Sequence, residues 1–321
     1  MKLFETKIKD EDLEEICKVL KKGKLGFGSN VNLFESKFKN FSNKKYNIAT
    51  NSASAAAFMI FAFLKEKYGV CDVYTTSLGF TSPAWAAKHF KHNLIFIDVQ
   101  DDLQFSCTHY KKIRDTLSSN NVSVVMPVLY GGVSKINNFN LLGDEILVVD
   151  SAHCVTPTIS SDFIFFSFHP YKPICTSDGG MVSTDNKEAN LFFRNYRNFG
   201  RTMNSNSYTI EKDGFKFYMN NLNATIGLTQ IKRYEENLKI RKENYNLLQN
   251  KYDLIPHDKK SSYYFATTLI GEANNIINNI GISRNYPMLH KMEYYNCSHT
   301  LHNLENLHDK ILNLPLWRTF E

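Results

Sequence analysis

The sequence has no apolar run close to the roughly 18 residues that a membrane-spanning helix needs. Its first residues form an acidic amphipathic pattern where a secretion signal would have an apolar core. The six cysteines show neither a CxxC pair nor a metal-ligand spacing, so we expect reduced thiols, no disulfide framework and no metal site. Together these absences predict a cytoplasmic protein that does not insert into a membrane.

The sequence also lacks a block of charge. The net charge is +6, but Lys and Arg are interspersed with Asp and Glu along the chain. A modestly basic surface of this kind favours an anionic small molecule as partner and is weak support for nucleic acid, which we do not expect. With 321 residues, 43% of them hydrophobic, the chain can bury the core of one large domain with a smaller companion.

Apolar runs alternate with helical patterns along the first half of the chain. The strand-like runs cover 47–50, 73–77, 93–99, 122–128, 145–150 and 162–168, and the helical patterns cover 9–22, 52–66, 82–91 and 109–118. Such alternation predicts an α/β domain with a mostly parallel sheet. In that architecture ligands bind at the carboxyl ends of the strands.

The pattern changes beyond about residue 220. Residues 220–252 place apolar side chains at helical spacing opposite a charged face, which predicts a long helix that could bridge two domains. The stretch that follows, with a helical segment at 273–282, is typical of a smaller strand-helix-strand unit. We therefore expect a large domain of residues 1–230 and a small C-terminal α/β domain of residues 231–321.

Two ionisable residues follow neighbouring strand-like runs. Asp150 ends the run "EILVVD", and Lys172 lies on the loop after "DFIFFSF". An acid and a lysine at two successive strand ends are a plausible catalytic pair. A buried salt bridge, or an aspartate that only caps the next turn, explains the same spacing equally well.

Other strand ends add small and aromatic residues. The segment Asn51–Ser54 begins an apolar helix, where free backbone N–H groups suit a phosphate, although ordinary N-capping is the commoner reason for such a sequence. Phe80 could cover a planar ligand or belong to the core. Pyridoxal 5'-phosphate (PLP) combines a flat ring, a phosphate, a nitrogen that needs a carboxylate and a carbonyl that a lysine attacks. Burial would favour the neutral, nucleophilic form of Lys172.

The motifs "VVDSAH", "SFHPYK" and "SDGGMV" resemble those of the DegT/StrS family of PLP-dependent sugar aminotransferases. The segments "LGFGSNVNLFESKF", "NSASAAA", "GFTSPAWAA", "IFIDV", "MPVLYGG", "GFKFYMNNLNATIGLTQI", "GISRNYP" and "LNLPLW" follow in the family's order. The resemblance implies the type I fold of PLP-dependent transferases, which aspartate aminotransferases share. It also implies a homodimer with active sites at the dimer interface.

The resemblance assigns roles to individual residues. It implies that Lys172 bonds to the cofactor and shuttles a proton, and that Asp150 keeps the pyridine nitrogen protonated. The further cofactor contacts that it implies are the stacking ring of Phe80, His153 beside the ring's phenolic oxygen, and Ala53, Ser54 and Ser167 at the phosphate.

Two segments depart from the family pattern. Gly214–Tyr218 stands where the family usually has Gly-x-Asn-Tyr-Arg, whose asparagine reaches the neighbouring subunit's cofactor phosphate. Lys216 could make that contact as a cation or lie on the surface, and Tyr218 in place of the arginine puts the usual anion contact in doubt. Ser177–Asp178 replaces Gly-Glu, a milder change that keeps the acid.

The implied reaction moves an amino group from L-glutamate to a nucleotide-linked keto-sugar, with pyridoxamine 5'-phosphate formed between the two half-reactions. A PLP enzyme of the same fold acting on a non-nucleotide ketone, a dehydratase, and a non-catalytic regulatory homologue remain as alternatives. Lys172 disfavours the dehydratase, whose relatives carry histidine there. We expect His169 and Tyr171 to position the lysine loop and His290 to be structural, and Tyr130 is a further candidate for contact with substrate.

Overall fold

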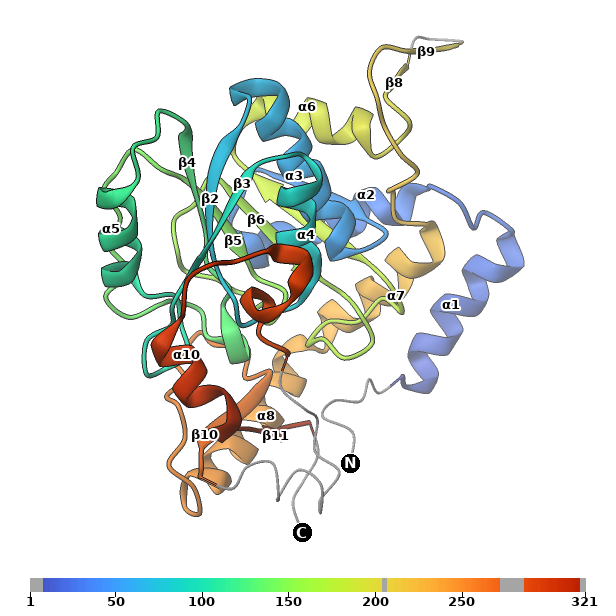
Figure 1. Ribbon diagram of the computed structural model, residues 1–321. Helices are drawn as coiled ribbons and strands as arrows, with labels where there is room; N and C mark the ends of the chain where they lie inside the picture. Colours follow the sequence, from blue (N-terminus) through green and yellow to red (C-terminus); the bar gives the residue numbers. More distant parts are fainter. Residues whose placement is uncertain (1–7, 204–206, 272–285, 318–321) are drawn as a thin grey trace.

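A computed structural model of the chain describes residues 8–203, 207–271 and 286–317. Its centre is a seven-stranded sheet in the order β1-β7-β6-β5-β4-β2-β3 (Figure 1). The strands are β1 (Tyr46–Thr50), β2 (Cys71–Thr76), β3 (Asn93–Ile97), β4 (Val122–Met126), β5 (Ile146–Asp150), β6 (Phe163–Ser167) and β7 (Gly180–Thr184). Only β7 runs antiparallel to its neighbours, so the other six strands end at the same edge of the sheet.

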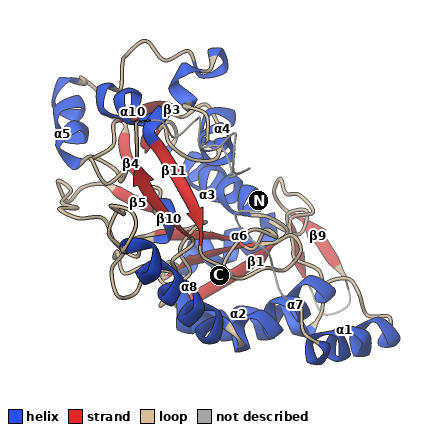
Figure 2. Ribbon diagram, turned by 90° about the horizontal axis from the view of Figure 1, so that it is seen from below, coloured by secondary structure: helices blue, strands red, loops and turns tan. Residues whose placement is uncertain are grey.

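Helices cover both faces of this sheet. They are α1 (Asp10–Lys22), α2 (Ser29–Ser42), α3 (Ala53–Tyr68), α4 (Thr81–His89), α5 (Cys107–Thr116), α6 (Lys187–Tyr196), α7 (Asn221–Lys232) and α8 (Tyr234–Gln249). In the core, α3, α4 and α6 pack on one face, and α2, α5, α7 and α8 pack on the other. Figure 2 shows α1, α2, α7 and α8 in a row along one side of the molecule.

The central strands are buried on both sides because their apolar runs alternate between the two faces. In β6, Phe163 and Phe165 belong to the core under α3, while Ile164 and Phe166 belong to the core under α2. Successive side chains of a strand point to opposite faces, so a continuous apolar run is what a doubly covered strand requires. This explains why the six strand-like runs in the sequence are all strands of the sheet.

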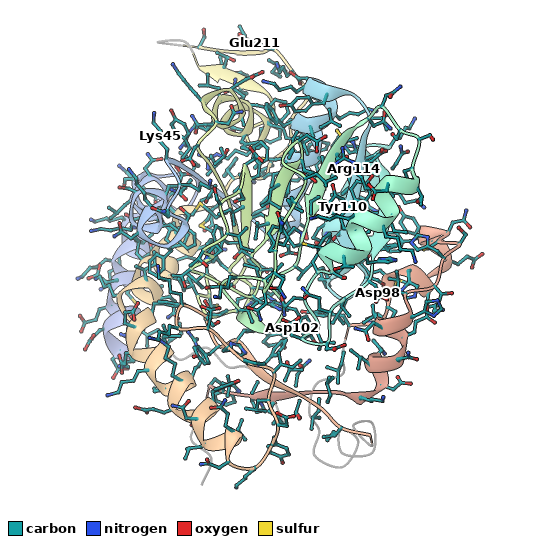
Figure 3. The ribbon with its side chains drawn as sticks, turned by 90° about the vertical axis from the view of Figure 1, so that its left-hand side faces the viewer. Lys45, Asp98, Asp102, Tyr110, Arg114 and Glu211 are labelled. Atoms are coloured by element: carbon teal, nitrogen blue, oxygen red, sulfur yellow. The ribbon has the colours of Figure 1, made fainter. Side chains whose placement is uncertain are left out.

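The loop before β5 is fixed by a polar cluster that positions the strand carrying Asp150. Figure 3 shows Tyr110 and Arg114 on α5, and Arg114 Nη1 donates a hydrogen bond to the Tyr110 hydroxyl at 3.0 Å. That hydroxyl in turn donates to Glu145 Oε1 at 2.7 Å, and Arg114 Nη2 pairs with Asp144 at 2.7 Å. The residues that lead into β5 are therefore held against α5.

The sequence analysis did not anticipate helices α2 and α6 or strand β7. The long helix expected over 220–252 is two helices, α7 and α8, separated at Arg233, whose backbone (φ −106°, ψ 3°) leaves the helical range. The Arg233 guanidinium pairs with Asp12 of α1 at 2.6 Å, which ties the break between the helices to the N-terminal helix.

The C-terminal part contains a second, two-stranded sheet of β10 (Phe265–Leu269) and antiparallel β11 (Ile311–Pro315), with α10 (His302–Leu307) beside it. The helix expected at 273–282 lies outside the described residues. Leu312 and Leu314 of β11 share a core with α2 and β6 of the large sheet, so this part is packed against the rest of the molecule. A two-stranded antiparallel sheet of β8 (Arg201–Met203) and β9 (Tyr208–Ile210) projects from the top in Figure 1.

The fold is therefore α/β with a mixed, mostly parallel sheet and a smaller C-terminal α/β part, as the sequence predicts. Among the helices of the described ranges, none is both long and apolar enough to cross a bilayer.

Candidate active site

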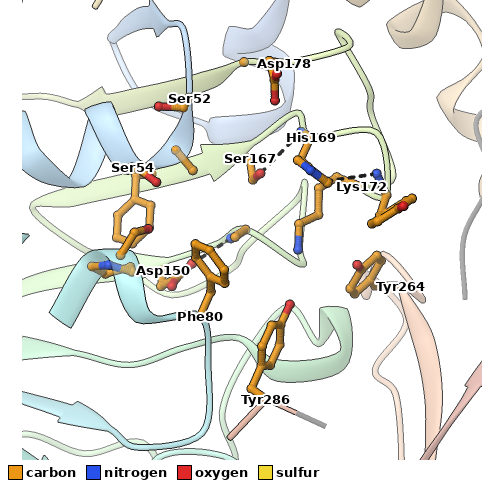
Figure 4. A pocket seen from close by; sticks show the side chains of 17 residues that line it. Ser52, Ser54, Phe80, Asp150, Ser167, His169, Lys172, Asp178, Tyr264 and Tyr286 are labelled. Atoms are coloured by element: carbon orange, nitrogen blue, oxygen red, sulfur yellow. Dashed lines mark hydrogen bonds between the residues drawn. The ribbon is translucent and has the colours of Figure 1, made fainter. Parts of the chain in front are cut away.

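A cavity of about 410 Å³ opens at the edge where the parallel strands end. Six of the residues predicted from the sequence line it, and they come from four different strand ends: Ala53, Ser54, Phe80, Asp150, Ser167 and Lys172. Figure 4 shows Lys172 extending into this space, with Phe80 and Asp150 on one side of its amine and Tyr264 on the other. The topology thus brings the predicted residues together as expected for the carboxyl edge of such a sheet.

The turn between β1 and α3 offers backbone donors to an anion. Ser52 caps α3 by accepting a hydrogen bond from Ala55 N at 3.1 Å, and the helix has no acidic residue in its first turn. The first N–H groups of a helix have no intrahelical acceptor, and the helix dipole adds positive potential there. The N–H groups of Ala53 and Ser54, which line the cavity, are therefore suited to a phosphate.

Strand β7 approaches this turn so closely that only glycine fits at its first position. A Cβ on Gly180 would lie 2.4 Å from the carbonyl carbon of Ser52 and 2.5 Å from Ala53 N. A side chain at this position would push the turn out of place. Gly180, the second glycine of "SDGG", is therefore explained by packing against the turn that offers its N–H groups to the cavity.

The loop after β6 delivers Lys172 to the centre of the cavity. Phe168 N donates to Gly179 O and Thr176 N donates to Phe168 O, both at 2.9 Å, so the loop is closed at its base. The Lys172 side chain is buried, and nothing in the described parts of the chain accepts a hydrogen bond from its amine. Burial lowers the pKa of Lys172 to about 8, while the negative charge of Asp150 opposes this shift.

Asp150 is buried at the end of β5. Its carboxylate accepts a hydrogen bond from Ala152 N at 3.0 Å. Burial raises the pKa of Asp150 to about 6, against the lowering effects of that N–H and of Lys172. Asp150 and Lys172 form no ion pair within the described residues, so the salt bridge that the sequence left open is absent. The cavity lies between a buried acid and a buried base.

His153 and Lys216 do not line the cavity. The His153 ring lies behind the wall, 4.5 Å from the Tyr264 ring, and its Nε2 shares a 3.3 Å hydrogen bond with the Tyr286 hydroxyl. Its Nδ1 is buried and has no partner among the residues that the structure describes, and burial holds the pKa of His153 well below its usual value. Lys216 is exposed, but its carbonyl accepts from Asn51 Nδ2 at 3.1 Å, which places its backbone beside the β1–α3 turn.

Tyr264 and Tyr286 complete the cavity from the C-terminal part and were missed in the sequence analysis. Both are roughly a hundred residues from Lys172 in sequence, so no local spacing connects them to the site. The only signal was indirect: Tyr286 belongs to the segment "GISRNYP". They place two hydroxyl-bearing aromatic side chains in the same cavity as Lys172 and Asp150.

The remaining candidates divide between cavity and core. His169 and Tyr171 line the cavity on the lysine loop, with ring centroids 5.1 Å apart. His290 is buried between Ser77 Oγ at 2.7 Å and Glu305 Oε1 at 3.0 Å and connects the C-terminal part to β2, which is a structural role. Tyr130 is buried, and its hydroxyl accepts a hydrogen bond from Asn313 Nδ2 at 2.9 Å, so it does not reach the cavity.

Comparison with known proteins identifies the family. The chain matches the sequence profile of the DegT/DnrJ/EryC1/StrS aminotransferase family over residues 6–321, nearly its whole length. The chain belongs to this family.

A relative similar in sequence is the UDP-4-amino-4,6-dideoxy-N-acetyl-beta-L-altrosamine transaminase of Campylobacter jejuni serotype O:2. The two are 27% identical over 305 residues, which cover 90% of this chain and 76% of the relative. The sequence resemblance to a family of aminotransferases is thus confirmed over nearly the whole chain.

Solved structures share the fold. Helicobacter pylori PseC, described as an aminotransferase involved in the biosynthesis of pseudoaminic acid, superposes with a TM-score of 0.87 at 20% identity and covers 98% of this chain and 93% of its own. The PLP-form of the sugar aminotransferase Spr1654 from Streptococcus pneumoniae gives a TM-score of 0.86 at 21% identity, covering 100% and 94%. These similarities support the fold. The roles of the site residues rest on the geometry of the cavity.

Proposed function

We propose that this protein is a PLP-dependent aminotransferase that moves an amino group from L-glutamate to a nucleotide-linked keto-sugar. The observation that carries the proposal is a buried lysine and a buried aspartate that face one cavity without pairing, beside a helix N-terminus suited to a phosphate. Membership of an aminotransferase family adds the reaction class.

The described residues fit PLP. The Lys172 amine, for which the described residues offer no acceptor, would hold PLP through the cofactor's carbonyl carbon if PLP binds in this cavity. A buried carboxylate whose pKa burial raises to about 6 gains from a cationic ring nitrogen. Phe80 is 60% exposed although it lines the cavity, so its ring face is free to cover a flat ligand. When bound, PLP supplies an electron sink for the pair released as a C–H bond beside the amino nitrogen breaks.

Lys172 Nζ is the group that moves the proton in this proposal. A pKa of about 8 means that both the neutral and the protonated amine are populated near neutral pH. General acid–base catalysis is most effective when the pKa of the group is close to the working pH. Lys172 can therefore take a proton from the donor carbon and return it at a neighbouring position without leaving the cavity.

Asp150 and the β1–α3 turn orient the cofactor. We assign Asp150 to the ring nitrogen, where the carboxylate holds a proton in place by charge and hydrogen bonding. We assign Ala53, Ser54 and Ser167 to the phosphate, because all three line the end of the cavity next to the N-terminus of α3. The cradle is fixed by Gly180, whose lack of a side chain lets β7 touch the turn. His153 lies behind Tyr264 and does not line the cavity, so it would influence the cofactor without touching it.

The substrate class is proposed from the relatives. The Campylobacter jejuni relative is named for a UDP-linked sugar with an amino group at C4. We propose the same class of acceptor here, a nucleotide-linked keto-sugar, for amino-sugar biosynthesis. The neutral, hydroxyl-bearing wall of Tyr264 and Tyr286 suits a sugar better than a second charged group.

We also propose a homodimer. The exposed aromatic side chains of the described residues include Phe27, Phe80, Trp85 and Phe215, of which Phe80 lines the cavity. Trp85 and Phe215 both pack against Phe58, so they form one patch on α4 and the strand-like segment before α7. A second copy on this patch would bring the exposed Lys216 toward the partner's phosphate turn. Sedimentation analysis of Trp85→Glu, expected to shift the protein to monomer, tests this assembly.

Two further expectations stay proposals. One is the division into a large domain of residues 1–230 and a small domain of residues 231–321. The other is a cytoplasmic location, which six free cysteines favour.

The proposed function is tested by the absorption spectrum of the full chain loaded with PLP, before and after L-glutamate. We expect a yellow band that L-glutamate bleaches as 2-oxoglutarate is released in equal amount. Addition of a UDP-linked 4-keto sugar should restore the band and yield an amino-sugar. A band that never forms, or one that L-glutamate leaves untouched, would contradict the proposal.

A further inference from the structure

The amine of Lys172 lies against an aromatic ring to which the proposed function assigns only a place in the sugar-facing wall of the cavity. Its Nζ is 4.6 Å from the centroid of the Tyr264 ring, within the range of a cation–π contact. Tyr264 is buried, lines the cavity and reaches it from the segment that precedes β10. In Figure 4 the ring stands beside the lysine chain on the side away from Asp150.

The backbone that carries Tyr264 is tied closely to the large sheet. Ser262 N donates to Gly132 O at 2.7 Å, and Tyr264 N donates to Gly131 O at 3.1 Å. Gly132 has φ +92°, and a Cβ there would lie 2.9 Å from Tyr264 N. The glycine is therefore required both by its own conformation and by the close approach of the tyrosine backbone.

A strained residue immediately before Tyr264 points the ring into the cavity. Tyr263 has φ +47°, a left-handed conformation that is unusual for a bulky side chain. Its ring is held by stacking on His257, with centroids 4.7 Å apart, and by an edge contact with Tyr245 at 5.3 Å. Strain of this kind persists where the surroundings over-determine it, and it clusters at functional sites.

We propose that Tyr264 is a positioning residue for Lys172: its ring face holds the amine in the cavity and stabilises the protonated form against the cost of burial. The inference rests on the role proposed for Lys172 in the aminotransferase reaction. Tyr264, a residue of the C-terminal part, thereby helps to set the proton affinity of the Lys172 amine.

The other groups around the Lys172 amine do not supply the contact that the Tyr264 ring makes. From β5, Asp150 attracts the ammonium without an ion pair. Burial together with the charge of Lys172 lowers the pKa of His153 and of His169, which favours the neutral imidazole in both. Burial raises the pKa of Tyr286 to about 12, which keeps its hydroxyl neutral. Asp178 and Tyr171 also line the cavity. Within the described residues, Tyr264 is the ring that lies over the Lys172 amine.

The test measures the proton affinity of Lys172 directly, in the full chain freed of cofactor. Trace labelling with acetic anhydride across a pH series, read by peptide mass spectrometry, gives the pH midpoint at which Lys172 becomes reactive. The other lysines in the same sample report whether the fold is intact. Because the reagent reacts with the neutral amine, a weaker hold on the proton lowers the midpoint.

We expect Tyr264→Leu to lower the midpoint by about 0.5 to 1.5 pH units, the equivalent of one cation–π contact in a buried site. Tyr264→Phe keeps the ring face and should stay at the wild-type midpoint. Tyr286→Leu is the matched control, because this tyrosine lines the same cavity without lying over the amine. A midpoint in Tyr264→Leu that is unchanged or raised would overturn the proposal.

A fluorinated ring keeps the test decisive if Tyr264→Leu does not fold. Pentafluorophenylalanine at this position preserves the shape of phenylalanine and reverses the ring quadrupole, so the midpoint should fall relative to Tyr264→Phe. Equal midpoints for these two rings would overturn the proposal. A labelling shift as expected, combined with a PLP spectrum that L-glutamate leaves unchanged, would refute the aminotransferase function while the positioning role stands.

Discussion

Two buried lysines in this protein have opposite surroundings. Lys44, at the start of β1, donates to Asp185 Oδ2 at 3.0 Å and to the Ser161 carbonyl. Lys172 is buried to a similar extent, yet nothing in the described ranges accepts a hydrogen bond from its amine. A lysine that only stabilises a fold is given acceptors, because an unpaired buried amine costs free energy. Lys172 has no such acceptor among the described residues and its amine faces the cavity, which is expected of a group kept for chemistry.

The largest effect should come from removing the unpaired lysine. We expect Lys172→Ala to lower kcat with L-glutamate by at least about 10³-fold, since it removes both the covalent attachment and the proton carrier. PLP should still bind through the phosphate turn. Lys44→Ala is the control and should leave kcat unchanged. Normal turnover by Lys172→Ala in a steady-state assay would contradict the proposed mechanism.

Asp150→Asn should have the next largest effect. The amide keeps the size of the side chain but cannot hold a proton on the ring nitrogen by charge, so we expect kcat to fall by about 10²-fold or more. Thermal unfolding should be little changed, because the carboxylate makes one described hydrogen bond, to Ala152 N. An unchanged rate would remove Asp150 from its assigned role.

Gly180→Ala should weaken PLP binding more than it affects chemistry. The added Cβ would lie 2.4 Å from the Ser52 carbonyl carbon, so the phosphate turn must move. We expect the Kd for PLP to rise about tenfold or more, equivalent to the roughly 1–3 kcal/mol of an overpacked site. Gly26→Ala is the control, because its Cβ would meet nothing within 4 Å. Equal Kd values in a fluorescence titration would argue against a phosphate at this turn.

The two lysines should respond in opposite directions when stability is measured. The folded-state pKa of Lys172 is about 8, below its usual 10.5, so its burial costs stability below pH 8 and the cost fades as pH rises toward 10.5. Lys172→Met should therefore raise the free energy of unfolding of the cofactor-free protein at pH 7, by up to about 3 kcal/mol, and the gain should shrink above pH 8.

Lys44→Met should lower the free energy of unfolding by about 1 kcal/mol, because it removes the donor to Asp185 and to the Ser161 carbonyl. Urea unfolding of both variants at pH 7 and pH 10 provides the comparison. Destabilisation by Lys172→Met at pH 7 would mean that its amine has a stabilising partner and that the contrast between the two lysines is false.

The sequence predicts one wall of the cavity much better than the other. Asp150 and Lys172 both follow apolar runs, and parallel strands bring their carboxyl ends to one edge, so local patterns suffice to place them together. Tyr264 reaches the cavity through the hydrogen bonds of its segment to Gly131 and Gly132, which are long-range contacts with no local signature. Strand β7 was missed for a similar reason, since its place between β1 and β6 depends on tertiary pairing.

The helix break at Arg233 shows the same limit. The apolar stripe of 220–252 continues through it, and Arg233, where α7 ends, pairs with Asp12 and Glu11 of the first helix. Local periodicity therefore identified the helical segment, while contacts between distant segments set its ends.

The central claim is that Lys172 is the lysine left free for the cofactor. The most direct measurement loads the full chain with PLP, reduces it with borohydride to make the attachment permanent, and locates the added pyridoxyl mass by peptide mapping. The account predicts one modified residue, Lys172, with Lys44 and the exposed Lys216 unmodified. Modification of another lysine, or a mass spread over several lysines while Lys172 stays unmodified, would contradict it.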